Sequence, residues 1–449
     1  MKKLTLGQVA AGLASGELTA VQLTAAALAH IADEQGEGVR TFTRVYAQWA
    51  QQQALTADRR RAEGKPLSAL DGVPVSVKDL FDVAGEATAA GSRVLAAAPA
   101  AAKHAAVVER LLQAGAVVIG KTNMTEFAYS GLGINPHYGT PANPWDRAAR
   151  RIPGGSSSGA AVAVADGMCL GSIGSDTGGS VRIPAAFCGL TGFKPTARRI
   201  NDGGLLPLSP SLDSIGVIAH DVAGCIALDT AITDRPLQPQ LKNLSQARFA
   251  VPQTLVLDGL DEEVAAGFHF SLQRLAQAGA QIETIPCTEF AELAAINAAG
   301  GFSALESWRW HQALIAEHAE EYDPRVLSRI RRGQPLGQGD LQQLQQQRAD
   351  WQRRVTAAVQ AFDALLMPTV PLVAPTVAEL EMDEEAYFRI NGAALRNPSV
   401  INFLDGCALS LPCQRPGGAP VGLMLAGLPM HDEALLGWAL AIERCLAGA

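Results

Sequence analysis

Short apolar segments with the alternation typical of β-strands recur along this chain of 449 residues, and segments with helical periodicity separate them. In residues 73–78, for example, valines alternate with Pro74, Ser76 and Lys78, which predicts a strand. Further strands are expected near 116–119, 170–173, 248–251, 364–367 and 421–425, and helices near 4–34, 43–63, 103–114, 159–165, 261–278, 302–320 and 339–361. Strands interleaved with helices in this way favour an α/β layer fold.

Glycine, proline, serine and asparagine are concentrated between residues 120 and 205. Within this region we predict that residues 130–158 and 174–204 are irregular loops, because these residue types favour turns over regular structure. Binding and catalytic residues are found disproportionately on loops held by a rigid scaffold. The functional site is therefore expected in this part of the chain.

The composition excludes several classes of protein. Lys and Arg total 36 against 44 Asp and Glu, and the net charge of −8 argues against a nucleic-acid-binding protein. No uninterrupted apolar stretch approaches the ~18 residues of a membrane span, and Met1–Thr5 does not begin a signal peptide. The 7 cysteines form no C-x-x-C pair and have no zinc-site spacing, so free buried thiols and no metal are expected. These features favour a cytoplasmic protein without a membrane partner.

Two matches to known motifs do not fit their sequence context. Gly115–Thr122 satisfies the P-loop pattern, but its middle is a β-branched apolar run that predicts a strand instead of an open phosphate-binding loop. Gly155–Gly159 satisfies G-x-S-x-G around Ser157, but a nucleophile elbow needs a buried strand immediately before it, and Arg150–Gly154 is not one. We therefore predict neither a nucleotide site nor an α/β-hydrolase triad.

Two serines and a lysine lie in three distinctive segments. Ser156 lies in Gly154-Gly155-Ser156-Ser157-Ser158-Gly159, and Ser180 follows 24 residues later within the Gly-rich segment 174–185. Lys78 ends the predicted strand 73–78. A serine hydroxyl is a poor nucleophile unless a base takes its proton, and no histidine of this chain lies in a recognisable triad context.

Lysine can act as that base only in its uncharged form. Burial in an apolar pocket would have to lower the pKa of Lys78, because low dielectric disfavours the ammonium. The neighbouring Asp79 would oppose this change. Successive strand residues face opposite sides, however, so Asp79 should point away if the strand continues that far.

Together the three segments resemble the amidase signature family. Further matching segments are Gly120–Phe127, Gly192–Thr196, Asn402–Gly406 and Pro420–Leu423. The resemblance covers nearly the whole chain and is tightest from about 70 to 220. It implies a single amidase domain over residues 1–449 with an α/β fold, in which helices cover both faces of a large, twisted, mixed central β-sheet. It also implies an amidohydrolase that uses no metal or cofactor and releases ammonia or an amine.

The resemblance further implies roles for individual residues. Ser180 would be the nucleophile that forms an acyl-enzyme, Ser156 would follow a cis peptide bond and relay protons, and Lys78 would be the base. The predicted oxyanion hole consists of the backbone N–H groups of Thr177, Gly178, Gly179 and Ser180. The predicted substrate-binding residues, which match the segment lining the acyl pocket, are Phe127, Ala128, Tyr129 and Ser130.

Several alternatives stay open at this point. Arg182 could bind a substrate carboxylate, but an ion pair with Asp176 or Asp213 that shapes the loop is the preferred interpretation. The resemblance implies a small-molecule amide as substrate without identifying it, and it leaves a homodimer open. One branch of the family is the glutaminase (A) subunit of the tRNA-dependent amidotransferase, which needs a partner subunit.

A free-standing amidase is preferred over that subunit for two reasons. The chain is short for the subunit, and its segment Ser130–Asn135 looks unlike it. A non-catalytic binding protein on the same fold is a further alternative. The presence of Lys78, Ser156 and Ser180 argues against it, because a decayed site would tolerate the loss of one of them.

Overall fold

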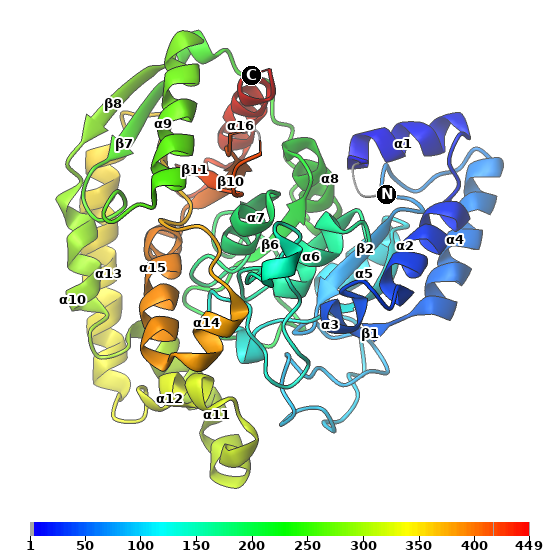
Figure 1. Cartoon of the computed structure of the whole chain (residues 1–449), viewed down its shortest axis with the longest axis horizontal. Helices are drawn as coiled ribbons and strands as arrows, with labels where there is room; N and C mark the ends of the chain where they lie inside the picture. The colour runs from blue at the N-terminus through cyan, green and yellow to red at the C-terminus, as the bar shows by residue number, and fades with distance from the viewer. Residues whose placement is uncertain (1–3, 416, 449) are drawn as a thin grey trace.

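One mixed β-sheet runs through the molecule in the computed structural model, which describes residues 4–415 and 417–448 (Figure 1). Residues 1–3, part of the N-terminal segment discussed above, lie outside the described residues. Within the described ranges 11 strands form this sheet, in the order β1-β3-β2-β4-β6-β5-β10-β11-β9-β7-β8. The strands are β1 Phe42–Val45, β2 Pro74–Lys78, β3 Val117–Thr122, β4 Gly171–Ser175, β5 Thr191–Lys194, β6 Ile215–Ala219, β7 Arg248–Pro252, β8 Gln281–Ile285, β9 Ala364–Pro368, β10 Cys407–Pro412 and β11 Gly422–Gly427.

Helices cover both faces of the sheet, as the α/β prediction required (Figure 1). The helices are α1 Leu6–Ser15, α2 Ala20–Ala32, α3 Gly38–Thr41, α4 Ala47–Ala62, α5 Ala106–Gln113, α6 Ser158–Ala165, α7 Arg182–Cys188, α8 Val222–Ile232, α9 Glu262–Gln277, α10 Glu292–Ile296, α11 Gly301–His318, α12 Pro324–Arg331, α13 Gln338–Val359, α14 Val377–Met382, α15 Glu384–Phe403 and α16 Asp432–Ala447. No helix in the described part of the chain is long and apolar enough to cross a membrane.

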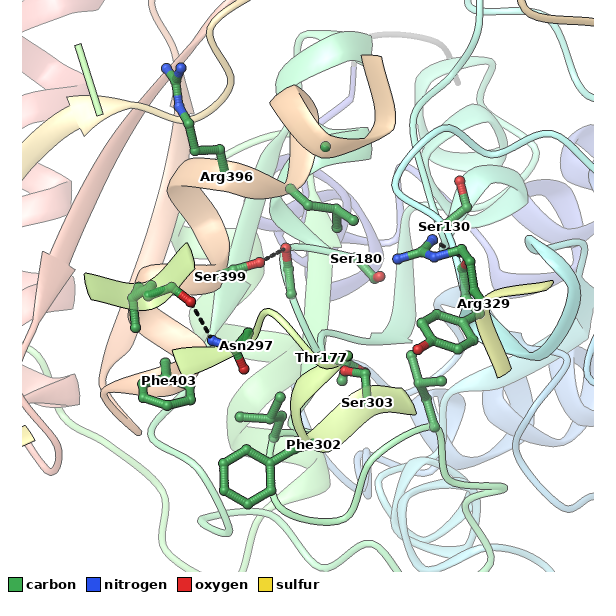
Figure 2. Close-up of a pocket in the computed structure, with 18 of the residues that line it drawn as sticks. Ser130, Thr177, Ser180, Asn297, Phe302, Ser303, Arg329, Arg396, Ser399 and Phe403 are labelled. Atoms are coloured by element: carbon green, nitrogen blue, oxygen red, sulfur yellow. Dashed lines mark hydrogen bonds between the residues drawn. The ribbon is translucent and has the colours of Figure 1, made fainter. Parts of the chain in front are cut away.

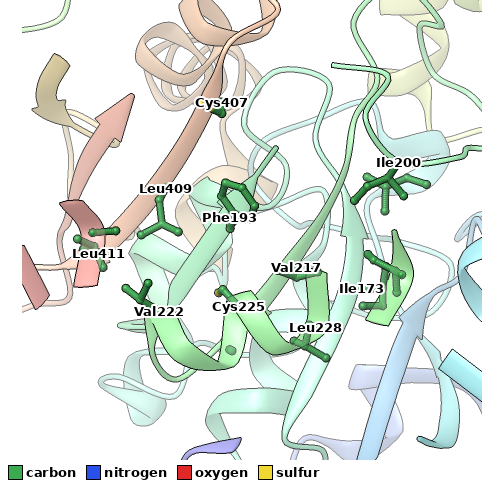
Figure 3. Packing of buried hydrophobic residues seen from close by; sticks show 14 of the residues in the cluster. Ile173, Phe193, Ile200, Val217, Val222, Cys225, Leu228, Cys407, Leu409 and Leu411 are labelled. Carbon is green, nitrogen blue, oxygen red and sulfur yellow. The ribbon is translucent and has the colours of Figure 1, made fainter. Parts of the chain in front are cut away.

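Successive side chains along the strands pack into two separate hydrophobic clusters, one on each face of the sheet. Val217 packs in the cluster beneath α5, α8, α9 and α16, whereas the next residue, Ile218, packs in the cluster beneath α2, α4, α6 and α7. Successive strand side chains point to opposite faces, so an apolar residue at every position is what a sheet covered on both sides requires. Figure 3 shows part of the first cluster, in which strand residues lie against α8; the labelled residues include Ile173, Phe193, Val217, Leu409, Val222, Cys225 and Leu228.

The Gly-rich segment 174–204 is more regular than predicted, since it contains α7 and β5. The prediction was wrong because a carboxylate that precedes the helix in the chain helps to stabilise this short helix. Asp176 accepts hydrogen bonds from the backbone N–H groups of Val181 and Arg182 at the start of α7 (3.2 and 3.4 Å). These N–H groups have no partner inside the helix, so a carboxylate there stabilises it.

The match to the P-loop pattern is a strand, as predicted. β3 spans Val117–Thr122, so its N–H groups pair with β1 and β2. Ser157 likewise follows an irregular segment and precedes α6, with no strand directly before it. Neither of the two motif matches therefore has the local structure that its motif needs.

The pairing of β2 with β4 determines where the functional side chains meet. The two strands are parallel neighbours, and Val77 of β2 lies opposite Ile173 of β4. The carboxyl ends of parallel neighbours reach the same edge of the sheet. Lys78 ends β2 and Ser175 ends β4, so both side chains are brought to one place.

Candidate active site

Lys78 is completely buried at the end of β2, and two serine hydroxyls surround its amine. Its Nζ donates to Ser156 Oγ at 2.7 Å and to Ser175 Oγ at 2.9 Å. Burial lowers the pKa of Lys78 from 10.5 to about 7, although the nearby carboxyl groups of Asp176 and Asp213 act in the opposite direction. An amine with this pKa is substantially uncharged at neutral pH.

Asp79 does not counteract this pKa change, in agreement with the expected alternation. Its carboxylate points to the other side of β2, where it forms a buried ion pair with Lys121 at 3.2 Å and accepts the Gly91 N–H. A carboxylate directly beside the Lys78 amine would favour the ammonium. The strand geometry therefore keeps one acid away from an amine that is its immediate neighbour in sequence.

The two serines of the predicted set lie on adjoining backbone segments. The Gly155–Ser156 peptide bond is cis, as the family resemblance implied. The Ser157 N–H donates to the carbonyl of Ser180 at 3.2 Å, which joins the two segments directly. Glycine at 155 is required by close approach, because a Cβ there would lie 2.5 Å from the backbone nitrogen of Gly133.

The predicted oxyanion hole needs one correction, at Gly179. Its N–H donates to Asp176 Oδ1 at 2.8 Å, so it points to a buried carboxylate instead of a substrate. Gly179 has φ of +121°, and a Cβ there would lie 2.6 Å from Pro398, so the position requires glycine for conformation. The N–H groups of Thr177, Gly178 and Ser180 donate to no acceptor in the part of the chain that the structure describes.

Asp213 holds the Thr177 side of this loop. Its Oδ1 accepts the Thr177 hydroxyl at 2.5 Å, and its Oδ2 accepts the N–H groups of Leu208 and Ser209, both at 3.0 Å. Burial raises the pKa of Asp213 to about 7, although the hydrogen bonds lower it. The residue thus orients the loop and also adds negative charge near Lys78.

Replacing Asp213 with asparagine is expected to lower kcat/KM by roughly tenfold, since the hydrogen bond from Thr177 is weakened. It should also move the acid limb of the pH–rate profile modestly to lower pH, because Asp213 is partly ionised near pH 7 and its ionised form raises the pKa of Lys78, which the amide cannot do. Initial rates across the pH range measure both effects. The exposed Asp202→Asn serves as control, and an acid limb that stays in place in Asp213→Asn would contradict the expectation.

Arg182 is structural, which is the interpretation preferred from the sequence. It is fully buried, and its Nε and Nη2 donate to the two carboxylate oxygens of Asp176 at 3.0 and 2.8 Å. The same Nη2 also lies within hydrogen-bond distance of the Pro398 carbonyl and Asn402 Oδ1. Burial alone would raise the pKa of Asp176, but the Arg182 guanidinium holds it well below its usual range. This ion pair fixes the 176–182 loop against α15.

Arg182→Met is expected to lower the free energy of unfolding by roughly 3–5 kcal/mol, because it leaves the buried carboxylate of Asp176 without its partner. Chemical denaturation measures the loss. Arg198→Met removes an exposed arginine that pairs with Asp405, and it should cost less than about 1 kcal/mol. Equal losses in the two variants would contradict this interpretation of Arg182.

A cavity of about 380 Å³ opens onto Ser180 and the loop that contains Thr177 and Gly178. Figure 2 shows Thr177 and Ser180 facing the side chains of Ser303, Arg329 and Ser399, which come from α11, α12 and α15. Of the predicted substrate-binding residues, Ala128, Tyr129 and Ser130 line the cavity. The Ser130 hydroxyl donates to Asn391 Oδ1 at 3.0 Å, so its position is fixed from α15.

Phe127 does not belong with them, and this part of the prediction is wrong. Phe127 is absent from the cavity lining, and its ring packs against His311 (centroids 4.3 Å apart) and Tyr322 (5.3 Å). Phe127 is therefore a core residue of the aromatic cluster beneath α11.

Several residues at the site were not predicted from the sequence. Ser175 could have been found by noting that it ends a strand, had the pairing of that strand with 74–78 been known. The cavity residues that lie far along the chain carry no local signal; they include Asn297, Ser303, Arg329, Arg332, Arg396 and Ser399. Within residues 4–415 and 417–448, no three His, Cys, Asp or Glu side chains cluster as metal ligands would.

Comparison with known proteins agrees with this geometry. The Amidase family model matches residues 22–436. The chain is 37% identical to a 2-amino-5-chloromuconic acid deaminase of Comamonas testosteroni over 98% of this chain and 96% of that protein. It is 34% identical to the A subunit of the glutamyl-tRNA(Gln) amidotransferase from Chloroflexus aggregans, over 96% of this chain and 94% of that protein. A crystal structure of an amidase superposes with a TM-score of 0.88 at 30% identity, over 99% of this chain and 100% of that one. The chain therefore belongs to the amidase family and is an amide-hydrolysing enzyme.

Proposed function

We propose that this enzyme cleaves a carboxamide C–N bond through an acyl-enzyme on Ser180, with Ser156 as proton relay and Lys78 as base. One observation carries the proposal: a fully buried lysine, with a pKa of about 7, lies 2.7 Å from the Ser156 hydroxyl. A base is most effective when its pKa lies near the working pH. Lys78 meets this requirement without a histidine.

Ser175 contributes by orienting the base. An uncharged amine has two N–H donors and one lone pair, and Ser175 Oγ lies 2.9 Å from Nζ as an acceptor for one of the donors. The lone pair is then available to the Ser156 hydroxyl. Ser156 can pass a proton to Lys78 while it receives one from Ser180, and Ser180 Oγ attacks the amide carbon.

The negative charge that develops on the amide oxygen needs donors that are already in place. The N–H groups of Thr177, Gly178 and Ser180 are suited to this role, since in the described part of the chain they donate to nothing else. Removal of one donor of this kind typically costs ~2.7–4 kcal/mol of transition-state stabilisation. Ser156 then returns its proton to the departing nitrogen, and water releases the acyl group from Ser180.

A fluorophosphonate probe tests the proposal directly. It reacts with an activated serine, so peptide mapping should place the label on Ser180, and labelling should be lost in Ser180→Ala. Ammonia release from a panel of primary amides provides the second readout, because the relative from Comamonas testosteroni is named as a deaminase. An unlabelled enzyme would support a non-catalytic binding protein on this fold instead.

A second candidate is the glutaminase subunit of a tRNA-dependent amidotransferase, which the similarity to the Chloroflexus aggregans protein favours. The two candidates differ in whether the chain needs a partner. A free-standing amidase should hydrolyse simple amides as a purified single chain. Turnover of glutamine only after addition of a partner subunit would support the amidotransferase.

A further inference from the structure

A carboxylate on α11 lies behind the wall of the active-site cavity. Phe302 and Ser303, in the first turn of α11, line the cavity (Figure 2). Glu306 lies four and three residues after them, so it is on the same side of the helix. Glu306 is not one of the described residues that line the cavity. Any effect of its carboxylate on the reaction must therefore pass through other residues.

The Glu306 carboxylate accepts three hydrogen bonds from the turn between Leu208 and Asp213. Its Oε2 accepts the Ser209 hydroxyl at 2.5 Å and the Ser211 N–H at 3.1 Å, and its Oε1 accepts the Ser211 hydroxyl at 2.5 Å. Ser209 is fully buried. Hydrogen bonds to a carboxylate are stronger than those between neutral groups, so α11 holds this turn in one position.

The same turn holds the loop of the proposed oxyanion hole. The Ser209 N–H donates to Asp213 Oδ2 at 3.0 Å, and Asp213 Oδ1 accepts the Thr177 hydroxyl at 2.5 Å. Ser214, the next residue, exchanges backbone hydrogen bonds with Asp176 (2.7 and 3.1 Å), which extends the pairing of β6 with β4. Ser209 thus connects two carboxylates, that of α11 through its hydroxyl and that of Asp213 through its N–H. A continuous series of hydrogen bonds leads from α11 to Thr177.

The orientation of Thr177 matters because its N–H belongs to the proposed oxyanion hole. A donor stabilises the developing charge only if it is already directed at the oxyanion, and groups of this kind must be held to within about 0.5 Å. Gly178 and Gly179 follow Thr177 directly, and glycine restricts the backbone less than any other residue. The loop therefore needs support from outside, and the turn held by α11 supplies it.

We propose that Glu306 is a positioning residue for the oxyanion hole. Acting through Ser209 and Asp213, it directs the Thr177 N–H toward the amide oxygen and so couples one wall of the cavity to the chemical step. The proposal rests on the function proposed above for Ser180. Because Glu306 does not line the cavity, its removal should lower kcat and leave substrate binding largely unchanged.

Steady-state kinetics of the full-length enzyme test the proposal, with the primary amide of the panel above that is hydrolysed fastest. Glu306→Ala should lower kcat by roughly 10- to 100-fold, the usual effect of losing hydrogen bonds to a charged group, and should change KM by less than about threefold. Glu306→Gln keeps one acceptor oxygen and should recover part of this loss. Glu317→Ala removes a largely exposed glutamate of the same helix and should keep the wild-type kcat. A rise in KM with kcat unchanged in Glu306→Ala would overturn the proposal.

A double-mutant cycle shows whether the effect passes through Thr177. Thr177→Val removes the hydroxyl that binds Asp213 and keeps the backbone N–H, so Glu306→Ala should lower kcat by less than about threefold further in that background. Fully additive losses would overturn the proposal. Ser209→Ala breaks the same connection by removal of one hydroxyl, and it takes the place of Glu306→Ala, with the same expected results, if that variant does not fold.

The rate of labelling separates this inference from the proposed function. A neutral fluorophosphonate should label Ser180 in Glu306→Ala to the same final extent as in the wild type, but more slowly by a factor similar to the loss in kcat. Equal labelling rates in the two proteins would overturn the inference and leave the proposed function intact. Absence of labelling at Ser180 in the wild type would instead contradict the proposed function.

Discussion

Ser180→Ala is expected to lower kcat by roughly 10⁴- to 10⁶-fold, because a covalent route without its nucleophile leaves only binding and oxyanion stabilisation. The substitution removes one hydroxyl from a residue that already borders the cavity, so the fold should be unaffected. Steady-state ammonia release measures the loss, and labelling with a fluorophosphonate shows whether the serine that reacts is the one removed.

Ser157→Ala is the matched control for this prediction. Ser157 is adjacent to Ser156 and is the residue that the misleading G-x-S-x-G match would make the nucleophile. Its hydroxyl donates only a long hydrogen bond, 3.4 Å, to the Ser175 carbonyl. Its removal should change kcat by less than about tenfold. If Ser157→Ala were as inactive as Ser180→Ala, the assignment of the nucleophile would fail.

Lys78→Met is expected to lower kcat/KM by roughly 10²- to 10⁴-fold, the usual contribution of a general base. In the wild type, kcat/KM should rise with pH through an apparent pKa near the value of about 7 that burial gives Lys78. Below that pH the ammonium predominates and cannot accept a proton. A rate that stays flat across neutral pH, with chemistry limiting, would be inconsistent with lysine as the base.

Lys78 is also expected to lower the free energy of unfolding by a measurable amount. Its pKa is about 7 in the folded protein, whereas a lysine in the solvated, unfolded chain has its ordinary pKa of 10.5. Between these two values the unfolded chain therefore binds more protons than the native one. The cost is fully present below about pH 7 and disappears as the pH rises toward about 10.5. At acidic pH, Lys78→Met should therefore unfold at a higher denaturant concentration than the wild type. Its free energy of unfolding should be larger by up to ~5 kcal/mol, less the contribution of the two hydrogen bonds that the lysine makes.

An exposed lysine provides the control for this stability effect. Lys65 is largely exposed and forms only a 4.0 Å contact with Glu63. Lys65→Met should leave both the stability and its dependence on pH unchanged. If the gain in Lys78→Met persisted undiminished at high pH, it would reflect better packing of methionine and not the removal of a buried amine.

Local sequence patterns identified the strand that ends in Lys78, the serine segments and helices such as α4, α5, α6, α9, α11 and α13, because backbone preferences and alternation act over a few residues. They missed α8, α12, α15 and α16. They did not identify α7, since Asp176 helps to stabilise that helix from outside it. The family resemblance assigned the Gly179 N–H to the oxyanion hole, whereas the folded loop directs it to Asp176. Arg329 lies 149 residues after Ser180, and no periodicity could place it in the same cavity.

The amino-acid sequence alone therefore determined the α/β class, the family and the three groups that carry the proposed chemistry, all of which depend on residue type and spacing. Only the tertiary structure decided that Lys78 titrates near neutral pH, that Ser175 lies within hydrogen-bond distance of its amine and that arginine residues line the cavity. These properties arise from burial and from distances between segments remote in sequence. Desolvation and Coulomb interactions depend on surroundings that exist only after the chain has folded.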